Sequence, residues 1–391
     1  MKRIGILTGG GDVPGLNSVI KSVVYRSSEV GWETLGIRRG WKGLTHVEAS
    51  REDGGGYVRR LDRVSTRAID RTGGTTLHTS RTNPSSMSRS ALPEGLDDAR
   101  IASMEIGDGR HDLTPLVLEN LERLGIEALV AIGGDDTLSY AARLGREGFP
   151  VIAIPKTMDN DVQGTEYCIG FSTAVTRAKE LINRQRTTLG SHERIGVFRI
   201  FGRNAGYTAW YAAYVTSARC VIPESPFDLE ALSAVLAEDW RLNPSNYAFV
   251  IASEGAIWSG GEIAEVGDTD AYGHRHKADV GQALAAELKR RTGIETVNSD
   301  LTYDLRSGDP DALDQLVAIT FANIAVDLLA EGTFGRMTAI RDGNYAHAPL
   351  PERALGARTL DVATMYNAER FRPRYEAKLG GPLLLGRAVT E

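Results

Sequence analysis

The chain has 391 residues and a formal net charge of −6 at pH 7; 42% of its residues are hydrophobic and 25% are charged. This length exceeds one ordinary hydrophobic core, so we expect two domains. The negative charge argues against a nucleic-acid-binding or membrane-surface protein. The amino-terminal apolar run is too short for a signal peptide, and we expect no transmembrane segment. Cys168 and Cys220 lie in apolar surroundings and suit a reducing compartment, so the predicted location is cytoplasmic.

A glycine-rich turn follows the first expected strand. The strand is Arg3–Leu7, the turn is Thr8–Asn17, and a helix is expected over Ser18–Glu29. Such a turn aims backbone amides and the helix dipole at an anion. It is neither a P-loop, which needs lysine where Leu16 lies, nor a dinucleotide fingerprint, which needs glycine where Pro14 lies. A tight turn without a ligand fits the sequence equally well.

The next polar stretches are less regular. A second strand is expected over Glu33–Arg38. Residues Arg71–Pro84 are expected to form a loop that is rich in hydroxyls and glycines and includes Arg81. This mixture is typical of phosphate pockets, although a solvated loop that binds no phosphate is the alternative. Residues 85–109 are polar and predict no element. Thr114-Pro115 indicates a helix start, and Gly125 its end.

Two buried strands carry the most informative loops. The apolar runs Ile126–Ile132 and Val151–Ile154 predict parallel strands. The first leads into Gly133-Gly-Asp-Asp136, and the second into Lys156-Thr-Met-Asp-Asn-Asp161. Glycines, carboxylates and a lysine at adjacent strand ends suit an anionic ligand carried with a metal ion.

Strands and helices alternate downstream, which predicts doubly wound α/β domains with ligands at the carboxyl ends of the strands. The expected strands are Arg194–Ile200, Ala218–Ile222 and Tyr247–Ala252. The expected helices are Ser172–Gly190, Asn204–Ser217, one opened by Ser225-Pro226, Asp279–Arg291, and one from Asp309-Pro310 to about Ala330. Residues Ile257–Lys277 predict a loop, in which His274 and His276 are expected to be solvated rather than to bind metal.

Gly133–Asp136 followed by Pro155–Asp161 resembles the phosphofructokinase family. The Pro-x-Thr-x-Asp-Asn-Asp string after Gly-Gly-Asp is highly specific, whereas Gly-Gly-Asp alone also occurs in NAD kinases and lipid kinases. The resemblance covers most of the chain, and it also includes Gly10–Asn17, Thr76–Arg81, Ser191–Arg194, Phe201–Arg203, Glu254 and Tyr303–Arg306.

The resemblance implies an α/β fold of two Rossmann-like, doubly wound domains with the active site in the cleft between them. The expected phosphoryl-donor domain comprises residues 1–170 and about 313–360. The expected sugar-phosphate domain comprises residues 171–312 and about 361–391. In relatives some site arginines come from a neighbouring subunit, so a homodimer or homotetramer is implied.

Two positions bear on the phosphoryl donor. ATP-using members of the family generally have glycine after Gly-Gly-Asp and a small residue after the proline, whereas pyrophosphate-dependent members have aspartate and lysine, as here in Asp136 and Lys156. A carboxylate at Asp136 would repel the α-phosphate of ATP, and Lys156 would neutralise the pyrophosphate leaving group. The alternative is that Asp136 only caps the following helix and Lys156 faces solvent.

The family further implies residue roles. Asp159 would be the general base that takes the proton from the sugar 1-hydroxyl, and Asp135 would hold Mg²⁺. Lys156 and Arg203 would stabilise charge on the transferring group, while Asp161 supports the loop. The residues expected to contact the donor are Gly11, Arg81, Asp136 and Lys156. Those expected to bind the sugar phosphate are Thr157, Met158, Asp159, Arg194, Phe201, Gly202, Arg203, Glu254, Tyr303 and Arg306.

The chain departs from the family at two positions that affect the acceptor. An arginine that usually helps to hold the sugar phosphate is replaced by Gln315, and Phe201 stands where methionine is common. The predicted reaction is reversible transfer from pyrophosphate to fructose 6-phosphate, giving fructose 1,6-bisphosphate and phosphate. Three alternatives remain: an ATP-dependent 6-phosphofructokinase, a pyrophosphate-dependent kinase that prefers sedoheptulose 7-phosphate, and a regulatory, non-enzymatic paralogue that binds sugar phosphate.

Overall fold

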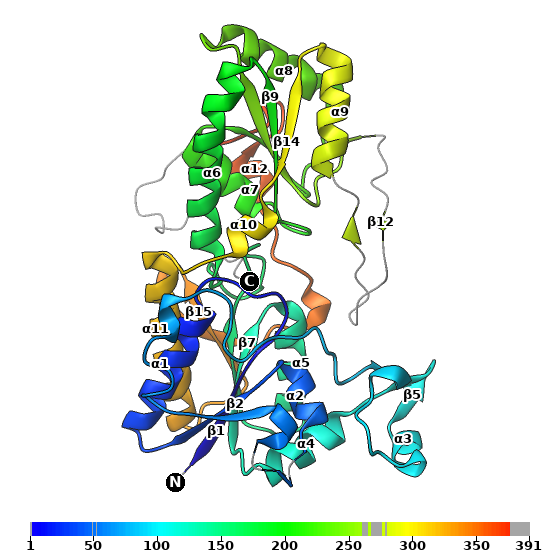
Figure 1. Ribbon diagram of the computed structural model, residues 1–391, viewed down its shortest axis with the longest axis vertical. Helices are drawn as coiled ribbons and strands as arrows, with labels where there is room; N and C mark the ends of the chain where they lie inside the picture. The colour runs from blue at the N-terminus through cyan, green and yellow to red at the C-terminus, as the bar shows by residue number, and fades with distance from the viewer. Residues whose placement is uncertain are drawn as a thin grey trace.

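Two sheets lie one above the other along the long axis of the molecule (Figure 1). The computed structural model describes residues 2–48, 50–51, 53–259, 265–266, 276–277 and 280–375. A seven-stranded sheet forms the lower half of Figure 1, and a four-stranded sheet forms the upper half. The strands of the larger sheet come from residues 3–155 and 336–349, and those of the smaller one from residues 195–300.

The larger sheet has the order β16-β15-β8-β7-β1-β2-β3. The five inner strands are parallel, and β16 and β3 are antiparallel edges. After β1 the chain adds β2 and β3 on one side of that strand, and then β7 and β8 on the other side. The strand order therefore reverses between β1 and β7, and such a reversal opens a ligand crevice at the carboxyl ends of these strands. The strands are β1 (Arg3–Thr8), β2 (Glu33–Ile37), β3 (Val58–Leu61), β7 (Ala128–Gly133), β8 (Val151–Pro155), β15 (Arg336–Arg341) and β16 (Asn344–Pro349).

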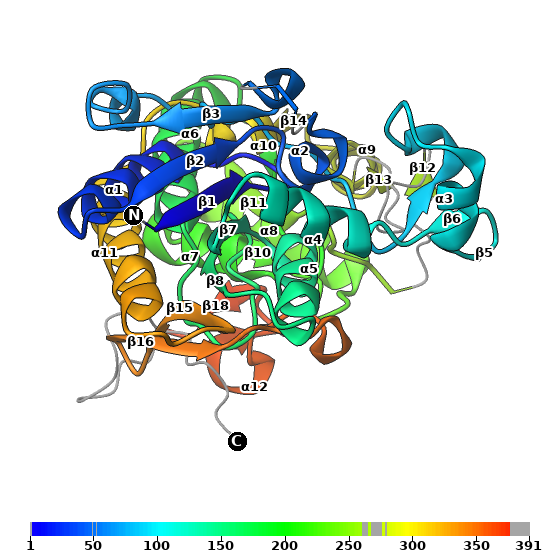
Figure 2. The same cartoon turned by 90° about the horizontal axis from the view of Figure 1, so that it is seen from below.

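Helices cover both faces of the larger sheet (Figure 2). The helices α1 (Leu16–Glu29) and α11 (Ala312–Ala330) pack on one face, where they enclose Ile4 and Ile6 of β1. The opposite face carries α2 (Trp41–His46), α4 (Thr114–Arg123) and α5 (Asp135–Arg146). Because both faces are covered, the inner strands β7 and β8 are continuous apolar runs rather than alternating, as the sequence predicted.

The smaller sheet is wholly parallel, in the order β10-β11-β9-β14. Its strands are β9 (Ile195–Ile200), β10 (Arg219–Val221), β11 (Ala248–Ser253) and β14 (Thr296–Asp300). Its helices are α6 (Phe171–Ser191), α7 (Tyr207–Thr216), α8 (Leu229–Leu242), α9 (Val280–Thr292) and the short α10 (Thr302–Arg306). Parallel strands joined by helices confirm the expected α/β class, while the exact domain bounds stay a prediction.

Shorter elements surround the two layers. A three-stranded sheet of β4 (Met87–Ser88), β6 (Arg110–His111) and β5 (Glu105–Gly107) projects beside the larger sheet with α3 (Asp98–Ser103), at the lower right of Figure 1. The remaining elements are β12 (Glu265–Val266), β13 (His276–Lys277), α12 (Val362–Met365), β17 (Tyr366–Asn367), β18 (Arg372–Pro373) and the 3-10 turns η1 (Gly54–Gly56), η2 (Ile69–Arg71), η3 (Arg89–Ala91) and η4 (Arg353–Leu355).

Several expected boundaries were wrong. The helix expected at Ser225-Pro226 begins at Leu229, because the Asp228 side chain accepts hydrogen bonds from the backbone amides of Glu230 and Ala231 and caps it there. The α11 helix likewise begins after Asp311 rather than at Asp309-Pro310, since the Asp311 side chain accepts from Asp314 N. The loop predicted over 257–277 falls largely outside the described residues, as does His274, whereas His276 lies in β13.

The α11 helix is the one described helix whose length and apolarity would suffice to cross a membrane. It packs closely against α1 and also contacts α6, β8 and β15. Half of its most apolar window is buried inside the protein. This packing is that of a core helix, and a core helix can have the same length and apolarity as a membrane-spanning helix. The absence of membrane association stays a prediction.

Candidate active site

A cleft of about 750 Å³ lies where the carboxyl ends of the two parallel sheets approach each other. It is lined by the turn after β1, the loops after β7 and β8, and the ends of β9, β11 and β14. The predicted site residues that line it are Gly11, Arg81, Asp135, Asp136, Lys156, Thr157, Met158, Asp159, Phe201, Arg203, Glu254, Tyr303 and Arg306. Segments that lie as far apart in the sequence as Gly10 and Ala357 therefore meet at this cleft.

Glycines allow the turn after β1 to pack against the start of α5. A Cβ atom on Gly9 would lie 2.5 Å from Thr137 Oγ1, and one on Gly133 would lie 2.2 Å from Thr137 Cβ. Gly10 adopts φ 77°, and its amide donates to Ser80 O at 3.0 Å. These glycines are needed for close backbone approach, which holds the turn and the Gly133–Asp136 loop side by side.

Lys156 joins the loop after β8 to the turn after β1. Its side chain is buried, with 3% exposed, and Nζ donates to Gly11 O at 2.5 Å. Burial, together with the positive charges of Arg306 and Arg81, lowers the pKa of Lys156 to about 7. The structure thus excludes the alternative in which Lys156 faces solvent.

Four of the carboxylates that line the cleft come from the segments after β7 and β8. Asp135 and Asp136 occupy the first turn of α5, where the helix dipole favours negative charge. Burial, followed by the charges of Asp136 and Asp159, raises the pKa of Asp135. Burial also raises the pKa of Asp159, and repulsion from Asp161 raises it further. Burial raises the pKa of Asp161 in the same way, with added repulsion from Asp135. Mutual repulsion among buried carboxylates favours binding of a cation.

The donor set fits a divalent cation shared with a phosphate. Carboxylate oxygens are the ligands that Mg²⁺ prefers, and this ion usually takes one or two of them and completes its shell with water and substrate phosphates. Within the described ranges, no three His, Cys, Asp or Glu side chains lie close enough to bind a metal on their own. Asp135 would therefore bind the ion together with the substrate rather than within a protein cage.

The loop from Thr157 to Asp161 is fixed by a residue that the sequence did not reveal. Asn160 adopts the left-handed φ of 54°. Arg358, with 2% exposed, donates to Asn160 O from Nε at 3.3 Å and from Nη2 at 2.7 Å, and its backbone amide donates to Asp161 O at 2.6 Å. Its guanidinium also lies over the Tyr207 ring at 4.3 Å. No local motif marks Arg358, because the contact spans 198 residues.

The acceptor side of the cleft is built on the ends of β9, β11 and β14. Arg203 N donates to Asp159 Oδ2 at 3.4 Å, which places the Asp159 carboxylate beside the Phe201–Arg203 loop. Arg199, also missed from the sequence, pairs with Glu254 at 3.4 Å and with Asp300 at 2.6 Å. This ion-pair network sets the orientation of the Glu254 carboxylate. The one available signal was the charge of Arg199 near the end of an otherwise apolar strand.

Arg306 reaches across the cleft toward the donor side. Its Nη1 donates to Asp12 O at 2.5 Å, and its guanidinium lies 4.8 Å from the Phe201 ring centre. Tyr303 from the same short helix is 81% exposed. The expected grip of Arg306 on the sugar phosphate stays a prediction, because in this structure the guanidinium contacts the glycine turn.

Three residues tied to the acceptor do not line the cleft. Gly202 lies just beneath it, where φ is 124° and Ser253 Oγ donates to Gly202 O at 2.7 Å. Arg194 lies at the amino end of β9, the end opposite the cleft. Gln315 lies in the first turns of α11 and does not line the cleft either. Arg194 therefore cannot act in the cleft of its own chain, and its reach into a second copy stays a prediction.

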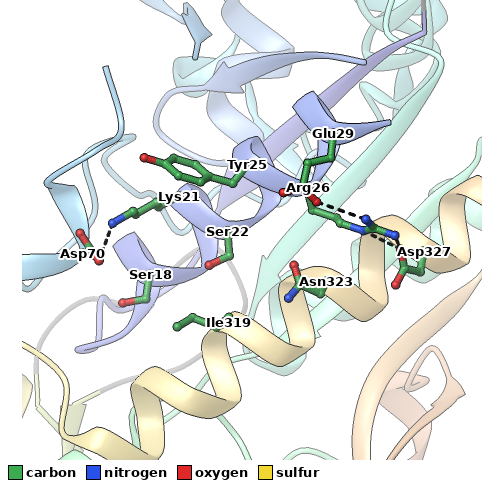
Figure 3. A pocket seen from close by; sticks show the side chains of 10 residues that line it. All are labelled: Ser18, Lys21, Ser22, Tyr25, Arg26, Glu29, Asp70, Ile319, Asn323 and Asp327. Atoms are coloured by element: carbon green, nitrogen blue, oxygen red, sulfur yellow. Dashed lines mark hydrogen bonds and ion pairs between the residues drawn. The ribbon is translucent and has the colours of Figure 1, made fainter. Parts of the chain in front are cut away.

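A separate hollow of about 440 Å³ lies between α1 and α11 (Figure 3). Its cations already have partners: Lys21 pairs with Asp70 at 2.7 Å, and Arg26 pairs with Asp327 at 2.7 Å. It contains none of the predicted site residues. The chemistry therefore belongs to the cleft between the sheets.

Comparison with known proteins places this geometry in a family. A family model described as Phosphofructokinase matches residues 3–329. The chain is 37% identical over 366 residues to a pyrophosphate–fructose 6-phosphate 1-phosphotransferase of Streptomyces coelicolor, covering 92% of this chain and 97% of that one. It is 36% identical over 370 residues to ATP-dependent 6-phosphofructokinase 3 of the same organism, covering 94% and 99%. Overall identity therefore does not decide the phosphoryl donor.

The fold is also that of solved relatives. A crystal structure of pyrophosphate-dependent phosphofructokinase from Marinobacter aquaeolei matches with a TM-score of 0.72 at 19% identity, covering 99% of this chain and 96% of that one. At this identity the likeness concerns the fold alone.

Proposed function

This chain belongs to the phosphofructokinase family of phosphotransferases, and we propose that its donor is pyrophosphate and its acceptor the 1-hydroxyl of fructose 6-phosphate. The products are fructose 1,6-bisphosphate and phosphate, and the reaction is reversible. The observation that carries the proposal is the donor side of the cleft, where buried Lys156 is bonded to the glycine turn and Asp136 lies in the first turn of α5.

Asp136 and Lys156 support pyrophosphate for complementary reasons. Asp136 lines the cleft on the donor side, so its carboxylate would repel any additional phosphate placed there. Lys156 can give its positive charge to the leaving phosphate, which in pyrophosphate has no nucleoside to help bind it. Because the Lys156 Nζ atom is held by Gly11 O, that charge is already positioned at the turn.

The remaining residues support in-line transfer. Burial, together with the charges of Asp161 and Glu254, raises the pKa of Asp159, which makes its carboxylate a stronger base for the 1-hydroxyl proton. Arg203 is anchored to that carboxylate through its backbone amide, so its side chain starts beside the reacting groups. Mg²⁺ held by Asp135 and the donor phosphates would neutralise charge that develops during transfer.

The proposal extends to the assembly and to the acceptor. A homodimer or homotetramer is proposed, because Arg194 could serve only a second copy of the chain. Fructose 6-phosphate is the named acceptor of the pyrophosphate-using relative. Sedoheptulose 7-phosphate is the second candidate, since its reacting end is the same and only the distal phosphate moves. Gln315, which suggested it from the sequence, does not line the cleft and gives it no support within this chain.

The deciding experiment is a donor comparison. Fructose 6-phosphate and Mg²⁺ are supplied with pyrophosphate or with ATP, and the bisphosphate formed is measured. We expect turnover with pyrophosphate and little with ATP. Turnover with ATP alone would overturn the donor assignment.

A double variant tests the physical reason. Asp136→Gly with Lys156→Gly removes the repelling carboxylate and the compensating cation together. We expect the kcat/KM ratio of ATP to pyrophosphate to rise by at least about tenfold, or about 1.4 kcal/mol. An unchanged ratio would show that these two residues do not choose the donor.

A further inference from the structure

A buried hydrogen bond holds the peptide that precedes Asp159 from the opposite side of the cleft. Thr208 Oγ1 donates to Met158 O at 2.6 Å, and Thr208 is completely buried. Met158 follows β8 of the larger sheet. Thr208 lies in the first turn of α7, which packs against β10 and β11 of the smaller sheet (Figure 1). The bond therefore joins the two halves of the molecule one residue away from the proposed base.

The direction of this hydroxyl is unusual for a threonine in a helix. Such hydroxyls commonly bond the carbonyl four residues back in the same helix. Thr216, at the other end of α7, does so, since its Oγ1 donates to Ala212 O at 2.6 Å. The Thr208 hydroxyl instead donates to a residue 50 positions earlier in the chain. Its bond therefore serves the loop after β8 rather than the helix.

A second contact from the same segment reaches Asp159 itself. Arg203 N donates to Asp159 Oδ2 at 3.4 Å, which is long for a hydrogen bond to an amide. The shorter bond from Thr208 thus does more to fix this part of the loop. Residues 203–208 together hold the Met158 carbonyl and the Asp159 carboxylate.

The segment that carries Thr208 is itself firmly anchored. Gly206 N donates to the two Glu224 carboxylate oxygens at 2.9 Å and 3.0 Å. Ser253 Oγ donates to Gly202 O at 2.7 Å. These bonds do not involve the Thr208 side chain. Loss of its hydroxyl should therefore leave the acceptor wall in place and release only the loop that carries Asp159.

The other side of Asp159 is fixed separately. Arg358 holds the carbonyls of Asn160 and Asp161, as described above. Met158 is only 3% exposed, so its carbonyl cannot readily exchange the threonine for bulk water. A buried carbonyl without a donor is unfavourable, and the peptide would turn to find another partner. That turn would move the adjacent Asp159 carboxylate.

We propose that Thr208 is a positioning residue, whose hydroxyl holds the Met158–Asp159 peptide so that the Asp159 carboxylate meets the acceptor hydroxyl. The inference rests on the proposed function, in which Asp159 takes the proton from the 1-hydroxyl. Thr208 does not line the cleft, so it acts through the loop and not on a substrate. A displacement of about 1 Å at a reacting group is enough to slow transfer by up to about a hundredfold.

The test compares three variants. Thr208→Val removes the hydroxyl and keeps the branched shape, whereas Thr208→Ser keeps the hydroxyl. The matched control is Thr216→Val, because Thr216 lies in the same helix, is 5% exposed and loses a hydroxyl bond of the same length. Steady-state kinetics with fructose 6-phosphate and Mg²⁺, with pyrophosphate or ATP as donor, gives kcat and both KM values. Urea denaturation measures stability, and hydrogen–deuterium exchange measures protection of the peptide over residues 157–162.

With the donor that wild type uses, Thr208→Val should lose about ten- to fiftyfold in kcat per folded molecule, with less than about threefold change in either KM. The KM for the donor is kept because Lys156 remains bonded to Gly11 O. Thr208→Ser should recover most of the loss, and Thr216→Val should keep wild-type kcat. Exchange over residues 157–162 should be faster in Thr208→Val alone.

The positioning role is overturned if Thr208→Val keeps wild-type kcat, if the loss falls on KM, if serine recovers nothing, or if Thr216→Val loses as much. If Thr208→Val does not fold, Thr208→Ala takes its place under the same criteria. If wild type turns over with neither donor, the proposed function fails and exchange decides the inference. A loop that is protected equally in wild type and in Thr208→Val would then overturn it.

Discussion

Replacing Arg358 by methionine tests whether this residue positions the catalytic loop. Methionine keeps much of the buried volume but cannot donate to Asn160 O or Glu166 O, which the guanidinium contacts at 2.7 Å and 3.3 Å. Asn160 O loses both of its donors, which costs about 1–3 kcal/mol, whereas Glu166 O still accepts from Asn160 Nδ2 at 2.9 Å. The left-handed Asn160 lies between Asp159 and Asp161, and any relaxation there moves both carboxylates.

The expected result is a fall in kcat of about ten- to a hundredfold, since each 1.36 kcal/mol corresponds to about tenfold in rate. The KM for pyrophosphate should change by less than about threefold, because Lys156 remains bonded to Gly11 O. Arg358→Lys, which retains one donor, should recover part of the loss. Steady-state kinetics measures both constants, and urea denaturation measures the accompanying loss of stability.

A matched control separates positioning from general instability. Arg219 is also buried, with 8% exposed, and its Nη1 donates to Arg370 O at 2.6 Å, away from the cleft. Arg219→Met should lower stability without lowering kcat per folded molecule. The positioning role of Arg358 is wrong if its variant keeps wild-type kcat, or if both variants lose kcat in proportion to their loss of stability.

Three further outcomes are expected. Asp159→Asn should lower kcat by about 10²–10⁴-fold with an unchanged circular dichroism spectrum, and more than a tenth of wild-type turnover would remove Asp159 from the role of base. Lys156 has a pKa of about 7, so at pH 8 it is mostly neutral and should take up a proton when the pyrophosphate anion binds. Titration calorimetry in buffers of different ionisation enthalpy should show that uptake in wild type and not in Lys156→Met, and equal uptake in both would contradict it. Asp314→Asn should lower the free energy of unfolding by about 2–3 kcal/mol, with activity per folded molecule retained. The reason is that the Asp314 carboxylate accepts hydrogen bonds from Tyr167, Gly170 and Thr173, where α6 meets α11. An unchanged midpoint of urea denaturation would refute this.

The sequence predicted three inner strands because their environment makes them apolar on both faces, but it missed the inner strand β15, whose sequence Arg-Met-Thr-Ala-Ile-Arg includes polar residues. The strands β1, β7 and β8 read as continuous apolar runs for this reason. It missed β14, Thr-Val-Asn-Ser-Asp, because four of its five residues are polar and none is fully buried. This strand is extended because it pairs with β9. The edge strand β16 was missed for the same reason, since pairing with β15 rather than burial of its side chains keeps it extended.

The residues of the site likewise fall into those that the sequence predicted and those that it missed. Its motif residues were predictable, because adjacent parallel strands must bring the loops after β7 and β8 together. Arg358 and Arg199 were not, since their partners are set by tertiary packing and no spacing rule links them to the motifs. Arg194 was assigned to the site by resemblance, and the structure places it at the other end of β9. Position along a strand thus decides whether an arginine can reach the cleft of its own chain.

The glycine turn after β1 is contacted from both sides of the cleft. Lys156 from the larger half donates to Gly11 O, and Arg306 from the smaller half donates to Asp12 O. Adjacent carbonyls thus receive cations from both sides of the cleft. A pyrophosphate oxygen is a stronger acceptor than a carbonyl, so donor binding should draw both cations from the turn onto the phosphates. Because Arg306 comes from the half of the chain that carries the smaller sheet, that exchange would link an anion at the turn to both halves.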